Sequence, residues 1–275
     1  MAGNKKKEDI MKNPLEDLKK YRYFLETIPL DEYRKKLKDI KWVEQDLVPQ
    51  LFPLKSIYTN YWEGADFLSF EDWFDKFWNE LQQNQPQKIK DLKELVRAHR
   101  KFYEDKVNNN LNNKVFLGFK ARMYRTLISV LTQLDFCYMF EHICAKEGKD
   151  LQLESNAELD AQGIDARIND IGFQIAKISQ RKEAAKILRK KKVVLIPYVV
   201  WDIDELKQKL QNPKTRIKSI YQKMINSFEK YFVRLENGFI VFREGYLKII
   251  IDNIENIEAV RKAVKKISLE LSGES

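Results

Sequence analysis

Apolar side chains recur at three- and four-residue spacings along the first half of the chain. Residues 10–28, 70–81 and 115–144 carry such stripes, which are typical of helices packed on a core. Residues 88–111 repeat the spacing with many charged side chains and predict a further amphipathic helix. The stretch 115–144 is the most apolar, so we expect it to be the central buried helix.

The pattern changes to alternation after Lys149. Strands are predicted at residues 151–154, 163–168, 171–178 and 193–196. Asn169-Asp170 is a turn signal between the second and third strands, and residues 181–192 read as a basic helix. A helix that joins neighbouring strands implies an α/β core with mixed pairing.

The remaining segments complete one predicted architecture. A helix is expected through residues 217–231, a strand at 238–242 and a C-terminal helix from about Ile254. The fold class is therefore α/β with a helix-rich, α+β-like N-terminal part. We expect a short basic tail at residues 1–7, followed by a single domain at 8–275 with a helical part (8–148) and a catalytic α/β part (149–275).

Composition narrows the protein class. The chain has 16 Phe, 12 Tyr and 5 Trp but only 9 Gly and 7 Pro, which excludes disordered and collagen-like proteins. A net charge of +9 favours polyanionic partners. Cys137 and Cys144 lie two helical turns apart, so we expect buried thiols in a reducing, cytoplasmic compartment. No apolar run reaches about 18 residues, which predicts that the chain does not span a membrane.

The candidate chemistry lies in residues 158–165, Glu-Leu-Asp-Ala-Gln-Gly-Ile-Asp, and in the strand that follows the turn. Asp160 and Asp165 supply carboxylates, and Gln174 and Lys177 supply an amide oxygen and an amine on the neighbouring strand. Such groups can converge at one end of a hairpin. Carboxylates bind Mg²⁺, and a lysine can help to activate water or neutralise charge during phosphodiester hydrolysis.

Each of these residues also has a structural interpretation. Asp165 sits in an apolar strand, where a charge is costly unless it is paired or metal-bound, which favours metal ligation over capping of a loop. Asp160 could equally cap a turn. Gln174 could make a structural hydrogen bond, yet its position opposite Asp165 favours a supporting ligand.

Strand alternation complicates the role of the amine. Side chains two residues apart share a face, so Gln174 and Ala176 should point together and Lys177 to the other side, unless a bulge intervenes. The usual carboxylate-x-lysine spacing is therefore broken at position 176. Other chemistries lack support, because the two histidines, His99 and His142, have no convincing catalytic context and no zinc, nucleotide or serine-nucleophile motif is present.

Four sequence blocks together resemble the TaqI type II restriction endonuclease family. They are residues 42–47 with 61–62, residues 121–126 with 136–138, residues 158–166, and residues 234–239 with 242–244. The blocks run from about residue 40 to 250 and so cover most of the chain; the block 158–166 is the most specific.

The resemblance implies a PD-D/E-x-K type nuclease core, that is, a mixed-sheet, restriction-endonuclease-like core flanked by helices. It also implies Mg²⁺-dependent double-strand cleavage of DNA at the palindrome TCGA, with Asp160 and Asp165 as the acidic pair. The family has Gln-Ile-Lys-Lys where this chain has Gln-Ile-Ala-Lys at residues 174–177. Either Lys177 is the catalytic amine, or Ala176 replaces that amine and the chain is a disabled, DNA-binding form.

A palindromic site cut on both strands is most simply read by a homodimer. Candidate phosphate contacts follow the active strand, although an ordinary solvated basic face is an equal alternative. They are Arg181, Lys182, Lys186 and Arg189. Two other functions rank lower: a structure-selective nuclease with the same core, and a helical interaction protein in which the acidic hairpin is a coincidence.

Overall fold

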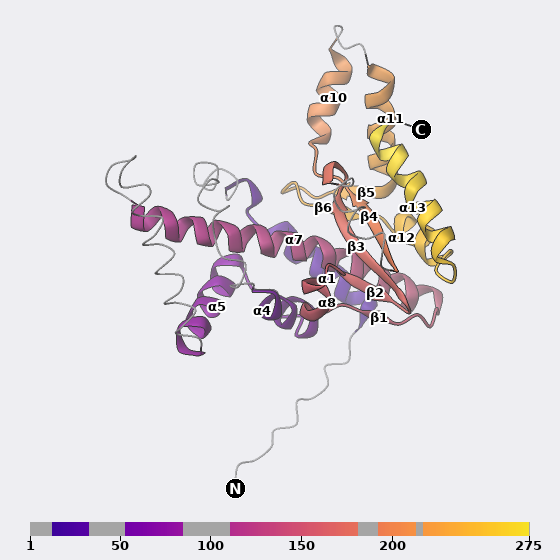
Figure 1. Cartoon of the computed structure of the whole chain (residues 1–275). Helices are drawn as coiled ribbons and strands as arrows, with labels where there is room; N and C mark the ends of the chain where they lie inside the picture. The colour runs from indigo at the N-terminus through magenta and orange to yellow at the C-terminus, as the bar shows by residue number, and fades with distance from the viewer. Residues whose placement is uncertain (1–12, 33–52, 85–110, 181–191, 213–216, 275) are drawn as a thin grey trace.

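The computed structural model describes residues 13–32, 53–84, 111–180, 192–212 and 217–274 (Figure 1). Its first half is helical: α1 (Pro14–Thr27), α4 (Leu54–Tyr58), the π-helical turn η3 (Thr59–Glu63), α5 (Phe70–Asn84) and α7 (Leu111–Glu147). The apolar stripes over residues 10–28, 70–81 and 115–144 are thus confirmed as α1, α5 and α7. The helix expected at residues 88–111 lies almost entirely outside the described residues.

The predicted strands form one mixed sheet in the order β1-β2-β3-β4. Its strands are β1 (Leu153–Glu154), β2 (Ala166–Ile168), β3 (Ile171–Lys177) and β4 (Val193–Tyr198). The first three pair antiparallel, whereas β4 pairs parallel with β3. Within the described part of the chain β4 is an edge strand, where proline is tolerated, so Pro197 lies within β4 and the strand ends two residues later than expected.

The C-terminal segments contain both expected and unexpected elements. The helix at 217–231 and the C-terminal helix are confirmed as α11 (Lys218–Tyr231) and α13 (Ile257–Ser272), and the strand at 238–242 as β6 (Ile240–Phe242). Three elements were not predicted: α10 (Ile203–Gln211), β5 (Phe232–Arg234) and α12 (Glu244–Ile251). The helix α12 has apolar residues on most of its circumference, which agrees with its contacts with α7, α11 and α13.

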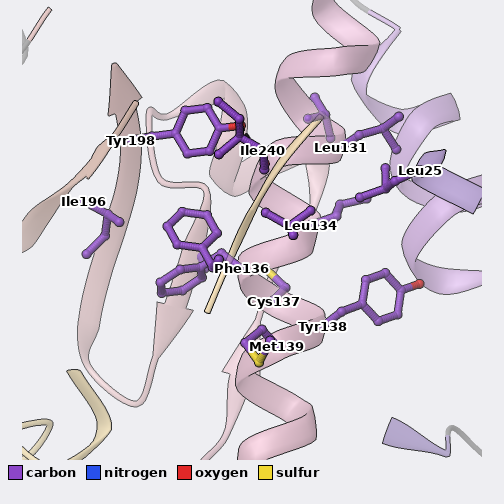
Figure 2. Packing of buried hydrophobic residues seen from close by; sticks show 14 of the residues in the cluster. Leu25, Leu131, Leu134, Phe136, Cys137, Tyr138, Met139, Ile196, Tyr198 and Ile240 are labelled. Atoms are coloured by element: carbon purple, nitrogen blue, oxygen red, sulfur yellow. Dashed lines mark hydrogen bonds between the residues drawn. The ribbon is translucent and has the colours of Figure 1, made fainter. Parts of the chain in front are cut away.

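The central helix α7 connects the helical part to the sheet. Figure 2 shows Phe136 on the side of α7 that faces the strands and Tyr138 on the side of α1. Phe136 contacts Phe173 of β3 with ring centroids 6.0 Å apart, whereas Tyr138 stacks on Tyr21 of α1 at 4.3 Å. Residues 131–140 are all buried, which confirms that α7 is the central helix.

Figure 1 shows the sheet between α7 and the C-terminal helices, and α13 contacts β4. One apolar cluster includes residues of α1, α7, the sheet and α13. Cys137 and Cys144 are buried free thiols in α7, as expected. No helix within the described residues is long and apolar enough to span a membrane.

Candidate active site

A short helix and a glycine turn bring the acidic residues to the start of the hairpin. The Asn156 side chain caps α8 (Ala157–Ala161) by accepting from the Leu159 amide at 2.9 Å. The chain then turns at Gly163, whose φ of +78° is a conformation that favours glycine. Asp160 lies within α8, and β2 begins only at Ala166, so Asp165 directly precedes the strand in which it was expected.

Asp165 is 3% exposed and is held by two neutral donors. The side-chain amide Nε2 of Gln133 donates to its Oδ1 at 2.9 Å, and the backbone N–H of Ile175 donates to its Oδ2 at 2.5 Å. The main chain of Asp165 is fixed too, since its N–H donates to the Phe173 carbonyl and its carbonyl accepts from the Ser155 hydroxyl. The carboxylate is thus rigidly oriented.

The electrostatic environment of Asp165 disfavours its negative charge. Burial raises the pKa of Asp165 well above its usual value, and the Asp160 carboxylate raises it further. The hydrogen bonds from Ile175 and Gln133 oppose this rise. No Lys or Arg among the described residues forms an ion pair with either aspartate, so a cation from solution is the natural complement of the pair.

Asp160 has a similar but less enclosed environment. Burial raises the pKa of Asp160 to about 6, and a hydrogen bond from Tyr58 lowers it. The Tyr58 hydroxyl of α4 donates to Asp160 Oδ2 at 3.2 Å. Burial also raises the pKa of Tyr58, and the Asp160 charge adds to this rise, so the phenol stays protonated and can keep donating.

The side chains of β3 divide between the two faces of the sheet, as alternation predicts. Ile175 and Lys177 line a cavity on the face that α7 covers, together with Gln133. Gln174 and Ala176 point to the opposite face, where the Gln174 amide lies next to Gly163. Within the described residues, no hydrogen bond joins Gln174 to Asp160 or Asp165. Its role as a supporting ligand stays a prediction.

The cavity on the α7 face has a volume of about 300 Å³. It lies between α7, the ends of β3 and β4, and the segment that leads into β6. Arg125 and Lys177 are the charged residues of its lining, and Tyr198 and Phe239 contribute aromatic walls. Gln133 therefore joins this cavity to Asp165, because it lines the first and is hydrogen-bonded to the second.

Some predicted site residues lie elsewhere or outside the described part. Arg181, Lys182, Lys186 and Arg189 are outside the described residues, as is His99. Among the residues that the structure does describe, no three His, Cys, Asp or Glu side chains cluster as a ready-made metal site. The two aspartates would therefore need oxygen atoms from another source, such as water, an amide or DNA phosphate, to complete a coordination shell.

Sequence reasoning missed the two side chains that hold the aspartates. Tyr58 lies in a short helix with no motif of its own. Gln133 had a visible signal, because it is a polar residue within the most apolar stretch of the chain, where each polar side chain needs a partner.

Comparisons with known proteins agree with these observations. A family model described as TaqI restriction endonuclease matches residues 18–254. Type II restriction enzyme TaqI of Thermus aquaticus is 35% identical over 247 residues, which cover 85% of this chain and 86% of that protein. Type II restriction enzyme TthHB8I of Thermus thermophilus is also 35% identical, over 84% of this chain and 85% of its own. No solved structure gave a match. The chain therefore belongs to the TaqI family of restriction endonucleases, which are enzymes that hydrolyse DNA at specific sites.

Proposed function

We propose that this chain cuts both strands of DNA at the palindrome TCGA in a Mg²⁺-dependent reaction, with Asp160 and Asp165 as the metal ligands. The observation that carries the proposal is a buried carboxylate, Asp165, next to the half-buried Asp160, with no ion-pair partner for either among the described residues. The TCGA sequence follows from the resemblance to the TaqI family. Double-strand cleavage of a palindrome supports a homodimer, in which each copy cuts one strand.

The chemistry of the site fits a hard divalent cation. Type II restriction enzymes generally need a divalent metal ion. The groups available here are oxygen donors, the ligands that Mg²⁺ prefers, with no thiol or imidazole among them. When bound, such an ion polarises phosphoryl oxygens and lowers the pKa of a coordinated water. Asp160 and Asp165 would hold the ion, and no Lys or Arg among the described residues forms an ion pair with them that would compete with it.

Lys177 is the amine that the arrangement favours. It lines the cavity with Gln133, and Gln133 is hydrogen-bonded to Asp165, whereas position 176 lies on the opposite face of β3. The Lys177 ammonium can balance negative charge on the reacting phosphate or hold the attacking water. Gln174 lies on the same face of β3 as position 176, so the support of the metal by its amide oxygen stays a separate prediction.

The second candidate function is a site-specific DNA-binding protein that cannot cut, which is favoured by the alanine at position 176. The test compares Mg²⁺-dependent cleavage of matched duplexes, with and without TCGA, by the chain itself, Lys177→Met and Ala176→Lys. We expect the unaltered chain to cut only the TCGA duplex and Lys177→Met to lose activity. Cleavage by Ala176→Lys alone would instead assign the amine to position 176 and identify the chain as a disabled nuclease.

The proposal also includes contacts with the DNA backbone by four cations, Arg181, Lys182, Lys186 and Arg189. Their segment follows β3 and η4 (Ile178–Gln180) directly along the chain, so its cations can contact the DNA backbone close to the reacting phosphate. Substituting two of them should weaken binding to duplexes with and without TCGA alike and reduce the salt dependence of binding. Unchanged salt dependence would remove them from the interface.

A further inference from the structure

We propose that Gln133 of α7 is a positioning residue that orients the Asp165 carboxylate for metal binding. This inference rests on the proposed function, because it concerns the same acidic pair. It assigns a role in the reaction to the central helix, which supplies neither of the two aspartates.

The contact between the two side chains is short and enclosed. Gln133 is 8% exposed, and its Nε2 lies 2.9 Å from Asp165 Oδ1. An ionised carboxylate can only accept hydrogen bonds, so the amide must present its nitrogen to Asp165. The interaction joins residues 32 positions apart and fixes the end of the hairpin against the helix.

The amide oxygen of Gln133 shows that the residue does not serve stability alone. Its Oε1 is buried and has no hydrogen-bond partner among the described residues. A buried acceptor without a partner is unfavourable, and a leucine of similar size would avoid that penalty. The glutamine therefore does not stabilise the fold through a complete hydrogen-bond network. Among the described residues, the Gln133 side chain makes one hydrogen bond, the donation to Asp165.

Gln133 also supplies what the backbone alone cannot. The Ile175 N–H fixes Asp165 Oδ2, but a single hydrogen bond does not define the orientation of the carboxylate plane. The second donor fixes Oδ1 and so defines the plane of the carboxylate. Outer partners of this kind orient metal ligands, and their loss typically lowers metal affinity or activity 10- to 100-fold.

The neutral charge of the amide matters as much as its geometry. A lysine or arginine at this position would hold Asp165 equally well, but its charge would compensate the carboxylate and compete with a divalent cation. A glutamine orients the carboxylate and leaves its negative charge available. Gln133 also lines the cavity on the α7 face of the sheet.

The test measures Mn²⁺ binding to the full chain by titration calorimetry, with no turnover. We expect Gln133→Leu to weaken Mn²⁺ binding about tenfold or more. Thr132→Val is the matched control: Thr132 is also buried in α7 and lines the cavity, but its hydroxyl donates to the Ile128 carbonyl within the helix. This control should bind Mn²⁺ like the unaltered chain. Thermal unfolding checks that each variant is folded, and Gln133→Met replaces Gln133→Leu if the latter is not.

A double-mutant cycle separates positioning from a general structural effect. In the Asp165→Asn background, Gln133→Leu should cause no further loss of Mn²⁺ binding, since Gln133 acts through the carboxylate. Wild-type affinity in Gln133→Leu, or a loss that persists in the Asp165→Asn background, would overturn the positioning role. If Asp165→Asn binds Mn²⁺ as well as the unaltered chain, the metal site of the proposed function fails instead.

Discussion

Asp135, which belongs to α7, and Asp165, which accepts a hydrogen bond from Gln133 of α7, are both almost fully buried, but their surroundings differ in one decisive respect. Asp135 is 0% exposed and accepts hydrogen bonds from Arg22 Nε at 2.9 Å and from the Phe242 N–H at 2.7 Å. Burial raises the pKa of Asp135, and the Arg22 charge opposes that rise. This carboxylate has a cation of its own, and it ties α1, α7 and β6 together.

Asp165 has no such cation among the described residues. Its donors are an amide and a backbone N–H, and its charged neighbour, Asp160, is of the same sign. A protein that needed only to fold would gain from replacing this pair with apolar residues. Charge compensation distinguishes the structural Asp135 from Asp165, which we propose as a metal ligand. Burial and hydrogen bonding do not.

Substitution of Asp165 should have the largest effect on activity. We expect Asp165→Asn to lower the rate of TCGA cleavage at least roughly 1,000-fold, because loss of a metal ligand removes several kcal/mol of transition-state stabilisation. The free energy of unfolding without metal should stay the same or rise, since an uncompensated charge is removed. Quantitative cleavage and denaturant unfolding provide the two measurements. If Asp165→Asn is less stable than the unaltered chain but still cuts DNA under conditions in which it is folded, Asp165 has a structural role and is not a metal ligand.

Substitution of Asp135 should give the opposite pattern. Asp135→Asn leaves the Arg22 guanidinium without its carboxylate, and we expect the free energy of unfolding to fall by about 3–5 kcal/mol. The control is Glu16→Gln, which breaks the exposed ion pair between Glu16 and Lys19 and should change stability by less than about 1 kcal/mol. An Asp135→Asn variant as stable as this control would show that Arg22 does not compensate the buried charge.

The pH dependence of stability sharpens the comparison further. The folded-state pKa of Asp160, about 6, lies above the unfolded value of about 4, so the folded protein binds more protons and stability falls as the pH rises between these values. Ionised Asp160 thus costs about 2–3 kcal/mol at pH 7.

Metal-free unfolding of the unaltered chain and Asp160→Asn from pH 4 to 7 measures this cost. The variant should be the more stable of the two at pH 7 and should lose the part of the dependence that Asp160 contributes, while Asp165, whose pKa burial also raises, keeps its own. Asp150→Asn, at an exposed position, should behave like the unaltered chain. A parallel dependence in all three proteins would mean that Asp160 is not the titrating group.

Removal of the Tyr58 hydroxyl should have the smallest effect. The hydroxyl stabilises ionised Asp160, so Tyr58→Phe should move the acidic limb of the cleavage pH profile to higher pH by less than about one unit. The rate above this limb should change little, because the phenol does not touch the reacting atoms. A lower plateau with an unchanged midpoint would indicate that Tyr58 acts on the substrate itself.

Much of the fold was predictable because the residues that pack in the core recur at helical or strand spacing along the sequence. The stripes of α1, α5 and α7 and the alternation around the Asn169-Asp170 turn were visible in the sequence, and each follows from burial on one face. The helix α12 was not predicted, since Leu247, Ile250 and their neighbours form a short apolar run, interrupted by Lys248 alone, that could equally be a strand.

The site was predictable only as far as its chemistry is local. Asp160 and Asp165 lie five residues apart, and the turn between them is marked by Gly163. Tyr58 and Gln133 are separated from their aspartates by 102 and 32 positions, and only tertiary packing brings them together. The same holds for Arg22 and Asp135, which are 113 positions apart. Single-sequence periodicity carries no information on which polar side chains pair over such separations.

The most direct test of the central claim is Mg²⁺-dependent cleavage of a plasmid with one TCGA site by the unaltered chain and Asp165→Asn, beside a plasmid without the site. We predict that the unaltered chain converts the one-site plasmid to its linear form and leaves the site-free plasmid intact, while Asp165→Asn remains folded and cuts neither. Equal cleavage by Asp165→Asn, or no cleavage by the unaltered chain, would contradict the assignment of Asp160 and Asp165 as this chain's catalytic centre.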